Sequence, residues 1–316
     1  MTPLPPIPPA AFLAALKAAG EETRLRILAL LGRGDMTVSD LQAVLDQSQP
    51  RISRHLRLLA QAGLISRSRD GAWSFYGLTP EASVWLPGLA RLGDDPDLGA
   101  DAERLAALRE THAREAALFF ARNAADWDRI RALHAPDETV EGAMLELAGS
   151  DRVERLLDVG TGTGRMLEVF APLYREGLGI DTSSEMLAIA RAKLHASGAS
   201  GARVLRADLF DPDAAPGPFS FAVVHQVLHF LDRPGDAVAE TVRCLAPGGR
   251  ILVADFAPHD HEFLAREQSH RRLGFERETV ERWLVAAGAT PVAGWAIEPL
   301  HGDGLTVLLW LARRDG

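Results

Sequence analysis

The stretch that most constrains the fold of this chain lies at residues 156–165, which read Leu-Leu-Asp-Val-Gly-Thr-Gly-Thr-Gly-Arg. Its start is typical of a short buried strand that ends at a carboxylate, and residues 166–173 favour a helix. A strand, a glycine loop and a helix N-terminus together hold nucleotide-like ligands in open α/β sheets. Glycine has no Cβ, so the backbone can approach a ligand closely. Taken alone, the loop is compatible with a dinucleotide, another nucleoside ligand or no ligand.

The length and the charge distribution favour two domains of different character. A chain of 316 residues is longer than one ordinary domain. Residues 1–89 carry nine Lys and Arg against seven Asp and Glu, a balance of +2, so the net charge of −9 leaves −11 for the remainder. This asymmetry indicates that the N-terminal part meets a polyanion and the C-terminal part does not.

Cysteine content and hydropathy exclude several classes of protein. The single cysteine, Cys244, allows neither an intrachain disulfide nor a thiolate cluster. No apolar run reaches the length of a membrane span, and the N-terminus lacks the basic and apolar regions of a signal peptide. We therefore expect a cytoplasmic protein that has no membrane partner.

The sequence pattern of residues 10–80 predicts four helices followed by a hairpin. Apolar residues repeat at helical spacing, Thr37 is placed to cap the third helix and Ser48 to cap the fourth. Asp70 and Gly71 form a strong turn signal between two strand-like runs. This order of elements predicts a winged helix-turn-helix.

The fourth helix and the hairpin carry the residues that we expect to contact DNA. Residues 48–69 hold five arginines and no Asp or Glu. The start of such a helix meets base edges in the major groove, and arginines farther away meet phosphates or the minor groove. The predicted base-edge residues are Gln49, Ser53, Arg54 and His55; Arg57, Arg67 and Arg69 are assigned to phosphates or the minor groove, and Arg51 completes the set. The alternative is a solvated basic helix in a protein-binding winged helix.

This segment resembles the ArsR family of winged-helix repressors, through residues 22–28 (Glu-Thr-Arg-Leu-Arg-Ile-Leu) and residues 48–56. The resemblance implies a homodimer that binds palindromic double-stranded DNA and is released by an inducer. Metal-sensing members place thiolates in the helix before the recognition helix, where this chain has the hydroxyls of Thr37 and Ser39, which cannot replace soft ligands. A second family metal site is matched only incompletely by Asp101, His112 and Glu115. No metal site is therefore assigned.

Strands and helices alternate from residue 155 onward, which predicts a doubly wound parallel sheet. The second strand ends at Asp181, 17 positions after Gly164, where an acid can accept hydrogen bonds from both ribose hydroxyls. The third strand ends at Asp208. Two late strands, near residues 290–297 and 306–312, could form an antiparallel pair.

One glycine loop, acids after the second and third strands, a Pro-Gly-Gly turn at 247–249 and a terminal hairpin resemble, as an ordered set, the class I S-adenosylmethionine-dependent methyltransferases. A dinucleotide fold would instead present two mononucleotide halves. By this resemblance, Asp158, Gly160, Thr161, Gly162 and Gly164 hold the methionyl part of S-adenosylmethionine, Asp181 the ribose, Asp208 and Leu209 the adenine edge, and His225 lies beside the methyl group.

The expected fold class is a mainly α winged helix-turn-helix at residues 1–89 and an α/β Rossmann-like methyltransferase sheet with an antiparallel last strand at residues 151–316. Residues 90–150 are expected to be a helical linker or lid, with a helix from Ala102 to Asn123. Its aromatic residues, Phe119, Phe120 and Trp127, fit either a lid over the cofactor, as the methyltransferase resemblance implies, or plain core packing. The linker helix could also form a dimer seam.

Two functions remain open on the sequence. In the first, a transcriptional regulator also transfers methyl groups to an unknown small molecule, with His225 as the candidate catalytic residue if the acceptor must lose a proton. In the second, the domain is non-catalytic and senses S-adenosylmethionine or S-adenosylhomocysteine. A DNA methyltransferase is less favoured, because its Asn/Asp-Pro-Pro-aromatic signature is absent at residues 225–228. Arsenite methylation is disfavoured because that chemistry uses several cysteines.

Overall fold

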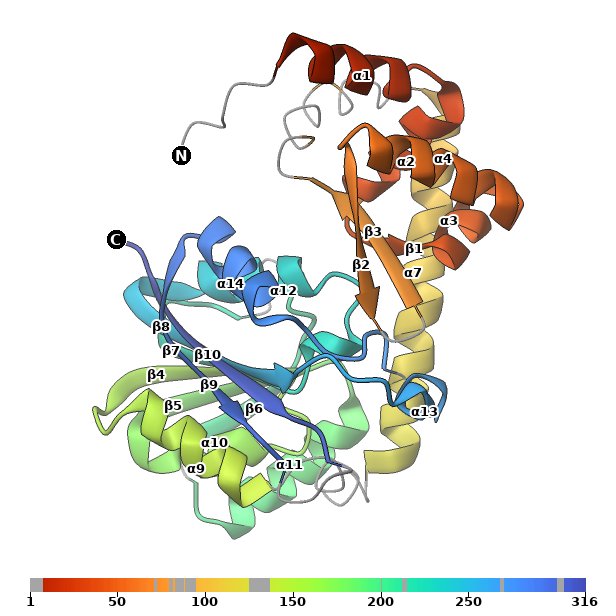
Figure 1. The fold of residues 1–316 in the computed structure, drawn as a ribbon. Coiled ribbons are helices and arrows are strands. Elements are labelled where there is room, and N and C mark those ends of the chain that lie inside the picture. Colours follow the sequence, from red (N-terminus) through yellow and green to blue (C-terminus); the bar gives the residue numbers. More distant parts are fainter. Residues whose placement is uncertain are drawn as a thin grey trace. The chain divides into compact units, whose positions relative to one another are not determined.

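The computed structural model describes residues 8–70, 73–79, 82, 88, 95–124, 137–199, 201–211, 215–267, 270–299 and 304–316. The chain divides into two compact units, Met1–Arg114 and Glu115–Gly316. Figure 1 labels the helices and strands of each. In the described part of the chain, no helix is both long enough and apolar enough to cross a membrane.

The first unit is a winged helix-turn-helix, as the sequence predicts. Its elements are α1 (Pro9–Ala19), α2 (Glu22–Leu31), β1 (Met36–Thr37), α3 (Val38–Leu45), α4 (Gln49–Gln61), β2 (Ile65–Asp70), β3 (Trp73–Leu78) and the start of α7 (Pro96–Asn123). The three strands pair antiparallel in the order β1-β3-β2, and β2 with β3 forms the predicted hairpin. Its turn at Gly71 lies outside the described residues.

Local signals explain where the helices of the first unit begin. Thr37 caps α3 in a capping box with Asp40: each side chain accepts a hydrogen bond from the backbone N–H of the other. Ser48 occupies the N-cap position of α4, but its side chain makes no capping bond. The buried stripe of α4, Ile52, Leu56 and Leu59, packs into the core of this unit.

Helix α7 begins six residues before the expected start, at Pro96 instead of residue 102. The Asp95 carboxylate accepts hydrogen bonds from the backbone N–H groups of Asp97 and Leu98, and this cap stabilises the additional turns. Asp101, only 1% exposed, forms ion pairs with Arg26 of α2 and with Arg104. The predicted lid residue Trp127 lies outside the described residues.

The second unit is a seven-stranded α/β sheet in the strand order β6-β5-β4-β7-β8-β10-β9. Its elements after α7 are α9 (Asp137–Ala148), β4 (Val153–Val159), α10 (Arg165–Val169), η2 (Ala171–Leu173), β5 (Tyr174–Asp181), α11 (Ser184–Ala196), β6 (Ala202–Arg206), β7 (Phe219–His225), η3 (Leu228–Phe230), α12 (Pro234–Arg243), β8 (Leu245–Phe256), α13 (Glu262–Glu267), α14 (Arg277–Ala286), β9 (Ala289–Ile297) and β10 (Val307–Arg314). The first five strands in this order, from β6 through β5, β4 and β7 to β8, pair in parallel with their neighbours. β10 pairs antiparallel with β8 and with β9. The predicted antiparallel end of the sheet is confirmed.

Side chains of the central strands alternate between two apolar cores, one on each face of the sheet. On β4, Leu157 and Val159 belong to the core that also holds residues of α12 and α14, whereas Leu156 belongs to the core shared with α9 and α10. Figure 1 shows these helix pairs on opposite faces of the sheet. Because β4, β5 and β7 are parallel, their carboxyl ends meet at one edge, where a ligand site is expected.

Candidate functional site

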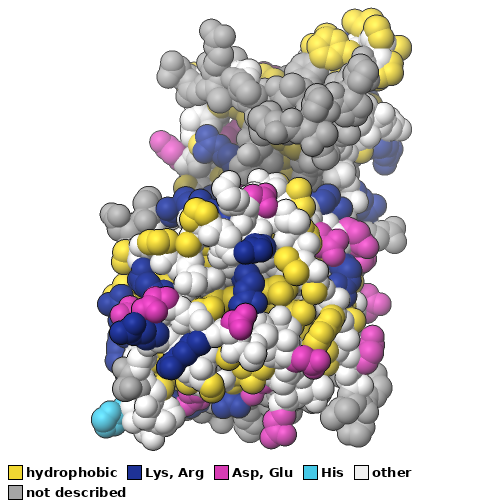
Figure 2. All heavy atoms as spheres, turned by 90° about the vertical axis from the view of Figure 1, so that its left-hand side faces the viewer, with side chains coloured by type: hydrophobic (Ala, Val, Ile, Leu, Met, Phe, Trp, Pro, Cys, Tyr) yellow, Lys and Arg dark blue, Asp and Glu magenta, His cyan; other side chains and the backbone are white. Residues whose placement is uncertain are grey.

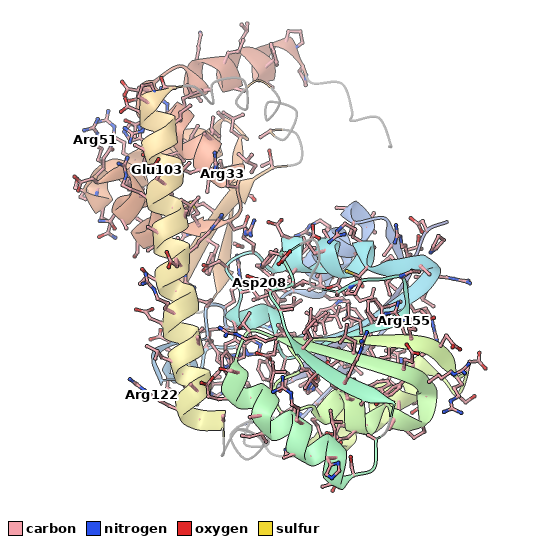
Figure 3. The ribbon with its side chains drawn as sticks, turned by 180° about the vertical axis from the view of Figure 1, so that it is seen from behind. Arg33, Arg51, Glu103, Arg122, Arg155 and Asp208 are labelled. Atoms are coloured by element: carbon pink, nitrogen blue, oxygen red, sulfur yellow. The ribbon has the colours of Figure 1, made fainter. Side chains whose placement is uncertain are left out.

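The exposed face of α4 is basic, as the sequence predicts. Gln49, Arg51, Arg54 and Arg57 are exposed, and Ser53 is half-buried. Arg51 points away from the core of the first unit in Figure 3. The helix thus offers several guanidinium groups to solvent while its apolar stripe is buried, which is the arrangement of a DNA recognition helix.

His55 departs from the expected outward direction. Its side chain is only 12% exposed, and its Nδ1 lies 3.5 Å from Oε2 of Glu21, the N-cap residue of α2. Burial lowers the pKa of His55, although the Glu21 carboxylate opposes this shift. We therefore no longer expect His55 to read a base; it packs α4 against α2.

Of the two hairpin arginines predicted to contact DNA, the structure describes the side chain of Arg67. Arg67 on β2 is exposed, and its Nε and Nη2 donate to Oγ of Ser74 on β3 at 2.9 and 2.6 Å. These bonds hold the guanidinium across the hairpin, where it can meet a phosphate. The side chain of Arg69, also predicted to contact DNA, lies outside the described part.

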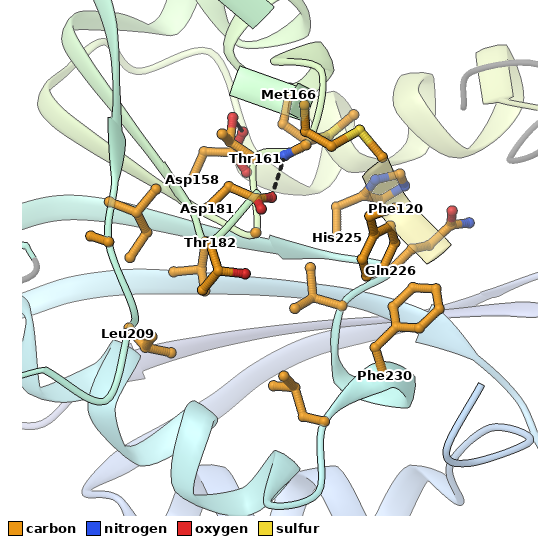
Figure 4. Close-up of a pocket in the computed structure, with 18 of the residues that line it drawn as sticks. Phe120, Asp158, Thr161, Met166, Asp181, Thr182, Leu209, His225, Gln226 and Phe230 are labelled. Carbon is orange, nitrogen blue, oxygen red and sulfur yellow. Dashed lines mark hydrogen bonds between the residues drawn. The ribbon is translucent and has the colours of Figure 1, made fainter. Parts of the chain in front are cut away.

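A pocket opens at the carboxyl ends of β4, β5 and β7, within the second unit (Figure 4). It encloses about 1020 Å³ of space not filled by protein atoms, a volume that includes the part open to solvent. Of the residues predicted to bind the cofactor, those that line it are Asp158, Gly160, Thr161, Gly162, Asp181, Asp208, Leu209 and His225. Gly164 does not line it; this residue has a φ of 84° and faces Ala190 of α11.

The glycine loop that follows β4 is closely packed against neighbouring elements. At Gly160, which has a φ of 65°, a Cβ would lie 2.5 Å from Cγ2 of Val227. At Gly179 on β5, a Cβ would lie 2.5 Å from Oγ1 of Thr161. The glycines are therefore needed both for the backbone conformation of the loop and for its close contact with β5 and the segment after β7.

Asp181, at the end of β5, joins the loop to the next helix. Its Oδ2 accepts a hydrogen bond from the backbone N–H of Gly162 at 2.9 Å, and its Oδ1 accepts one from Ser183 at the same distance. Burial raises the pKa of Asp181 above its ordinary value, despite these two backbone donors. Each carboxylate oxygen keeps a further lone pair that can accept a hydrogen bond from a ligand hydroxyl.

The other predicted acids also lie at strand ends. Asp158 is 1% exposed, and its Oδ2 accepts a hydrogen bond from Oγ1 of Thr161 at 2.6 Å. Asp208 lies in the loop after β6, and its Oδ1 accepts from the backbone N–H of Phe210 at 3.0 Å. Both carboxylates are thus held in place by their own loops at the pocket.

The end of the pocket away from Asp181 is aromatic and contains few charged groups. In Figure 4, His225, Gln226, Phe120 and Phe230 gather at one end, and Asp181 lies towards the other. The rings of Phe120 and Phe230 are 4.8 Å apart and nearly perpendicular. Phe120 belongs to α7, so at least this ring of the predicted aromatic lid lies at the ligand pocket.

A buried histidine–aspartate pair packs behind Phe230, one of the aromatic residues of the pocket. Nδ1 of His229 lies 2.7 Å from Oδ1 of Asp255, and the two side chains are 2% and 0% exposed. Asp255 also accepts a hydrogen bond from the backbone N–H of Leu228, which fixes the start of η3. The His229 ring packs against Phe230 with 4.1 Å between centroids, so the pair holds the pocket wall.

Sequence reasoning missed several residues of the pocket wall, which are Arg165, Met166, Thr182, Met186, Phe210, Gln226, Val227, Phe230 and Leu231. Thr182, Gln226 and Val227 directly follow the ends of β5 and β7, and that position is a signal available from the sequence. Arg165 is engaged by Glu141 of α9 through two hydrogen bonds of 2.7 Å, and this pairing raises its pKa. Phe120 carries no such positional signal.

Two family models match this chain, and each matches one unit. Residues 21–67 match the bacterial regulatory proteins of the arsR family, and residues 157–253 match a methyltransferase domain. The first match covers α2 to β2, and the second covers β4 to β8. The two matches agree with the winged helix-turn-helix and the parallel sheet described above.

Two of the curated relatives of the first unit are bacterial regulators of arsenic resistance. The arsenic resistance transcriptional regulator ArsR1 of Pseudomonas putida is 37% identical over 107 residues, which are 33% of this chain and 80% of that protein. The arsenical resistance operon repressor of Escherichia coli is 47% identical over 70 residues, but the match spans only 22% of this chain and 60% of that repressor.

A solved structure supports the fold of the second unit. The N-methyltransferase NodS of Bradyrhizobium japonicum, crystallised with S-adenosyl-L-homocysteine, superposes with a TM-score of 0.53 over 64% of this chain and 99% of that one. The sequence identity is 22%, so the likeness shows the fold alone. The chain belongs, by its N-terminal unit, to the arsR family of bacterial regulatory proteins, and a methyltransferase domain follows that unit in the same polypeptide.

Proposed function

We propose that this protein is a DNA-binding transcriptional regulator whose second unit binds S-adenosylmethionine and transfers its methyl group to a small molecule. The observation that carries the proposal is the pocket at the carboxyl ends of β4, β5 and β7, where a glycine loop meets the carboxylates of Asp158 and Asp181. This pocket shares a chain with the basic recognition helix α4.

The residues present fit S-adenosylmethionine. Asp181 has lone pairs left for the ribose hydroxyls, and Gly160 and Gly162, both with positive φ, line the pocket without a side chain. Asp158 is the carboxylate for the methionyl amine, and Asp208 with Leu209 lies where the adenine edge is expected. The NodS complex with S-adenosyl-L-homocysteine shows that this fold accommodates such a ligand in another protein.

When bound, S-adenosylmethionine supplies an electrophilic methyl group: an acceptor lone pair forms the new bond as the methyl–sulfur bond breaks and leaves its electrons on sulfur. The protein's part is to align the acceptor and exclude water. His225, 9% exposed and at the aromatic end of the pocket, is our candidate base for an acceptor that must lose a proton.

Calorimetric titration of the full chain with S-adenosylhomocysteine tests the cofactor half of the proposal. We expect saturable binding that Asp181→Ala weakens, because this change removes the ribose acceptor. An absence of binding by the wild-type protein would overturn the proposal. A matched control is Glu176→Ala on the same strand, because that side chain is 67% exposed, outside the pocket, and should leave affinity unchanged.

A second function, sensing without catalysis, is favoured by the occurrence of α4 and the pocket in one chain. If S-adenosylmethionine or S-adenosylhomocysteine binds the DNA-competent and released states unequally, occupancy of the pocket changes DNA affinity. Gel shifts with a palindromic duplex, with and without each ligand, test this role. Equal DNA affinity in all three conditions would exclude it.

We also propose that the protein acts as a homodimer in the cytoplasm. The dimer proposal is supported by the apolar side chains of Phe12, Leu13 and Leu16 on α1, which are 44%, 55% and 41% exposed. The location follows from the proposed function, since a regulator has to reach the DNA that it controls. In analytical ultracentrifugation, the wild-type chain should sediment as a dimer, and the Leu13→Glu variant should shift towards monomer. A monomeric wild type would refute the dimer.

A further inference from the structure

The backbone of Gln226 adopts a conformation that long side chains rarely adopt. Its φ is 54°, in the left-handed region, and among the described non-glycine residues only Asp46 shares this sign. Asp46 ends α3, where aspartate is common in this conformation, but glutamine is not favoured there. The Gln226 N–H donates to the carbonyl of Ala254 on β8 at 2.7 Å, which holds the strained residue at the end of β7. Backbone strain of this kind clusters at functional sites.

The strained backbone places a polar side chain at the pocket. Gln226 lines the pocket and is only 6% exposed, so its carboxamide is largely removed from solvent. Its Nε2 has no hydrogen-bond partner among the residues that the structure describes. A buried amide donor without a partner is unfavourable, and a bound ligand that accepts from it would remove that penalty.

The surroundings of this amide indicate the chemical class of the ligand. Phe120 and Phe230 lie beside Gln226 at the same end of the pocket in Figure 4. Val227 and Leu231 complete an apolar wall, and the described residues of the lining include no lysine. Its one arginine, Arg165, is already paired with Glu141. Such a wall favours an uncharged planar ring over an anion or a flexible aliphatic chain.

We propose that Gln226 is a positioning residue for the methyl acceptor, and that this acceptor is an uncharged aromatic ring bearing a hydrogen-bond-accepting oxygen. The ring packs on Phe120 and Phe230, and the oxygen accepts from Nε2 of Gln226. This inference rests on the proposed function, because it names the acceptor class of the same pocket. It assigns the cofactor and the acceptor to opposite ends of that pocket.

The test measures binding of two ligands by the full chain, with 1-naphthol as the acceptor probe. Wild type, Gln226→Glu and Gln226→Gly are titrated first with S-adenosylhomocysteine and then, in its presence, with 1-naphthol. Gln226→Glu keeps the size of the side chain but removes the donor, and Gln226→Gly relieves the positive φ, so at least one variant should fold. We expect unchanged affinity for S-adenosylhomocysteine and a roughly tenfold loss for 1-naphthol, which corresponds to one hydrogen bond.

Matched probes separate the ring contact from the hydrogen bond. Cyclohexanol carries the oxygen without the planar ring, and 1-naphthoate carries the ring with a negative charge; we expect both to bind the wild type more weakly than 1-naphthol. Phe120→Leu should lower the affinity for 1-naphthol and leave that for cyclohexanol unchanged.

Three results would overturn the inference while leaving the cofactor proposal standing: no 1-naphthol binding by the wild type, equal 1-naphthol affinity in the Gln226 variants, or tighter binding of 1-naphthoate. A parallel loss of S-adenosylhomocysteine affinity in both variants would overturn it as well, by assigning Gln226 to the cofactor end. If the wild type bound 1-naphthol but no S-adenosylhomocysteine, the proposed function would fail instead.

Discussion

The recognition helix and the ligand pocket place charge in opposite environments. On α4, Arg51, Arg54 and Arg57 are exposed and extend from a helix whose buried stripe already stabilises it. In the pocket, Asp158 is buried, and its loop and that of Asp181 donate hydrogen bonds to the two carboxylates. An exposed charge can be replaced without harm to the fold, whereas a buried, hydrogen-bonded one couples ligand binding to stability.

On the surface of the second unit, charged side chains are distributed in a third way. On the face drawn in Figure 2, basic and acidic side chains are interspersed with apolar ones over this unit. Mixed charge of this kind suits a solvated surface and offers no continuous positive stripe to a phosphate backbone. On that face, this pattern agrees with our assignment of DNA contacts to the first unit, where α4 concentrates arginine.

The largest effect is expected at the pocket loop, from Gly160→Ala. The new Cβ would lie 2.5 Å from Val227 at a φ of 65°, so steric overlap adds to backbone strain. We expect a loss of about 4 kcal/mol in the free energy of unfolding and loss of S-adenosylhomocysteine binding. Gly149→Ala is the matched control, since its φ is 79° but no atom lies within 4 Å of the added Cβ; about 1 kcal/mol is expected there. Equal losses in urea denaturation would contradict the steric account.

A comparable loss of stability is expected in the first unit, but at a buried ion pair and not on α4. Asp101→Ala leaves Arg26, only 15% exposed, without its carboxylate partner, and should cost about 3 kcal/mol. Glu110→Ala removes an exposed partner of Arg114 and should cost less than about 0.5 kcal/mol. Thermal unfolding of both variants checks the difference, and a similar small shift for each would show that Asp101 is not a structural anchor.

A smaller effect is expected from pH at Asp181. Because burial raises its folded-state pKa above the ordinary 3.8, its contribution to stability is complete below pH 3.8 and is lost as pH rises through the folded-state value. Without a ligand, burial of Asp181 therefore favours the protonated acid, whereas hydrogen bonds from the ribose hydroxyls favour the carboxylate. We expect S-adenosylhomocysteine affinity to fall severalfold as pH falls through the raised pKa, and Asp181→Asn to abolish this dependence in calorimetry. The same pH profile in wild type and variant would assign the dependence to another group.

The smallest effect on stability is expected on the DNA-facing surface. Arg54→Ala should change the unfolding free energy by less than about 0.5 kcal/mol, because the side chain is exposed. Its effect should appear in duplex binding, with a lower affinity and, if Arg54 contacts a phosphate, a salt slope reduced by about one. His55→Ala should show the reverse, with a measurable stability loss and little change in the salt slope. Gel shifts at several salt concentrations decide between the two.

Local signals in the sequence determined most of the architecture. Helical spacing of apolar residues predicted α2 to α4, and alternation with turn signals predicted the hairpin and the parallel strands. Strong caps such as that of Thr37 were readable because the partners lie three residues apart. The glycine loop and the acids at strand ends were also readable, because a parallel sheet brings those ends to one edge. The start of α7 was missed because a turn-like composition obscured the Asp95 cap.

Only the tertiary structure decided the walls of the pocket and the direction of single side chains. Phe120 reaches the pocket from a helix more than 100 residues before Phe230, and Asp101 pairs with Arg26 across 75 positions. His55 lies on the predicted helix but is turned towards Glu21, because the close packing of α4 on α2 decides which flank of the helix is covered. Periodicity reports that a residue lies on a helix or strand; contacts between distant segments set its burial and its partners.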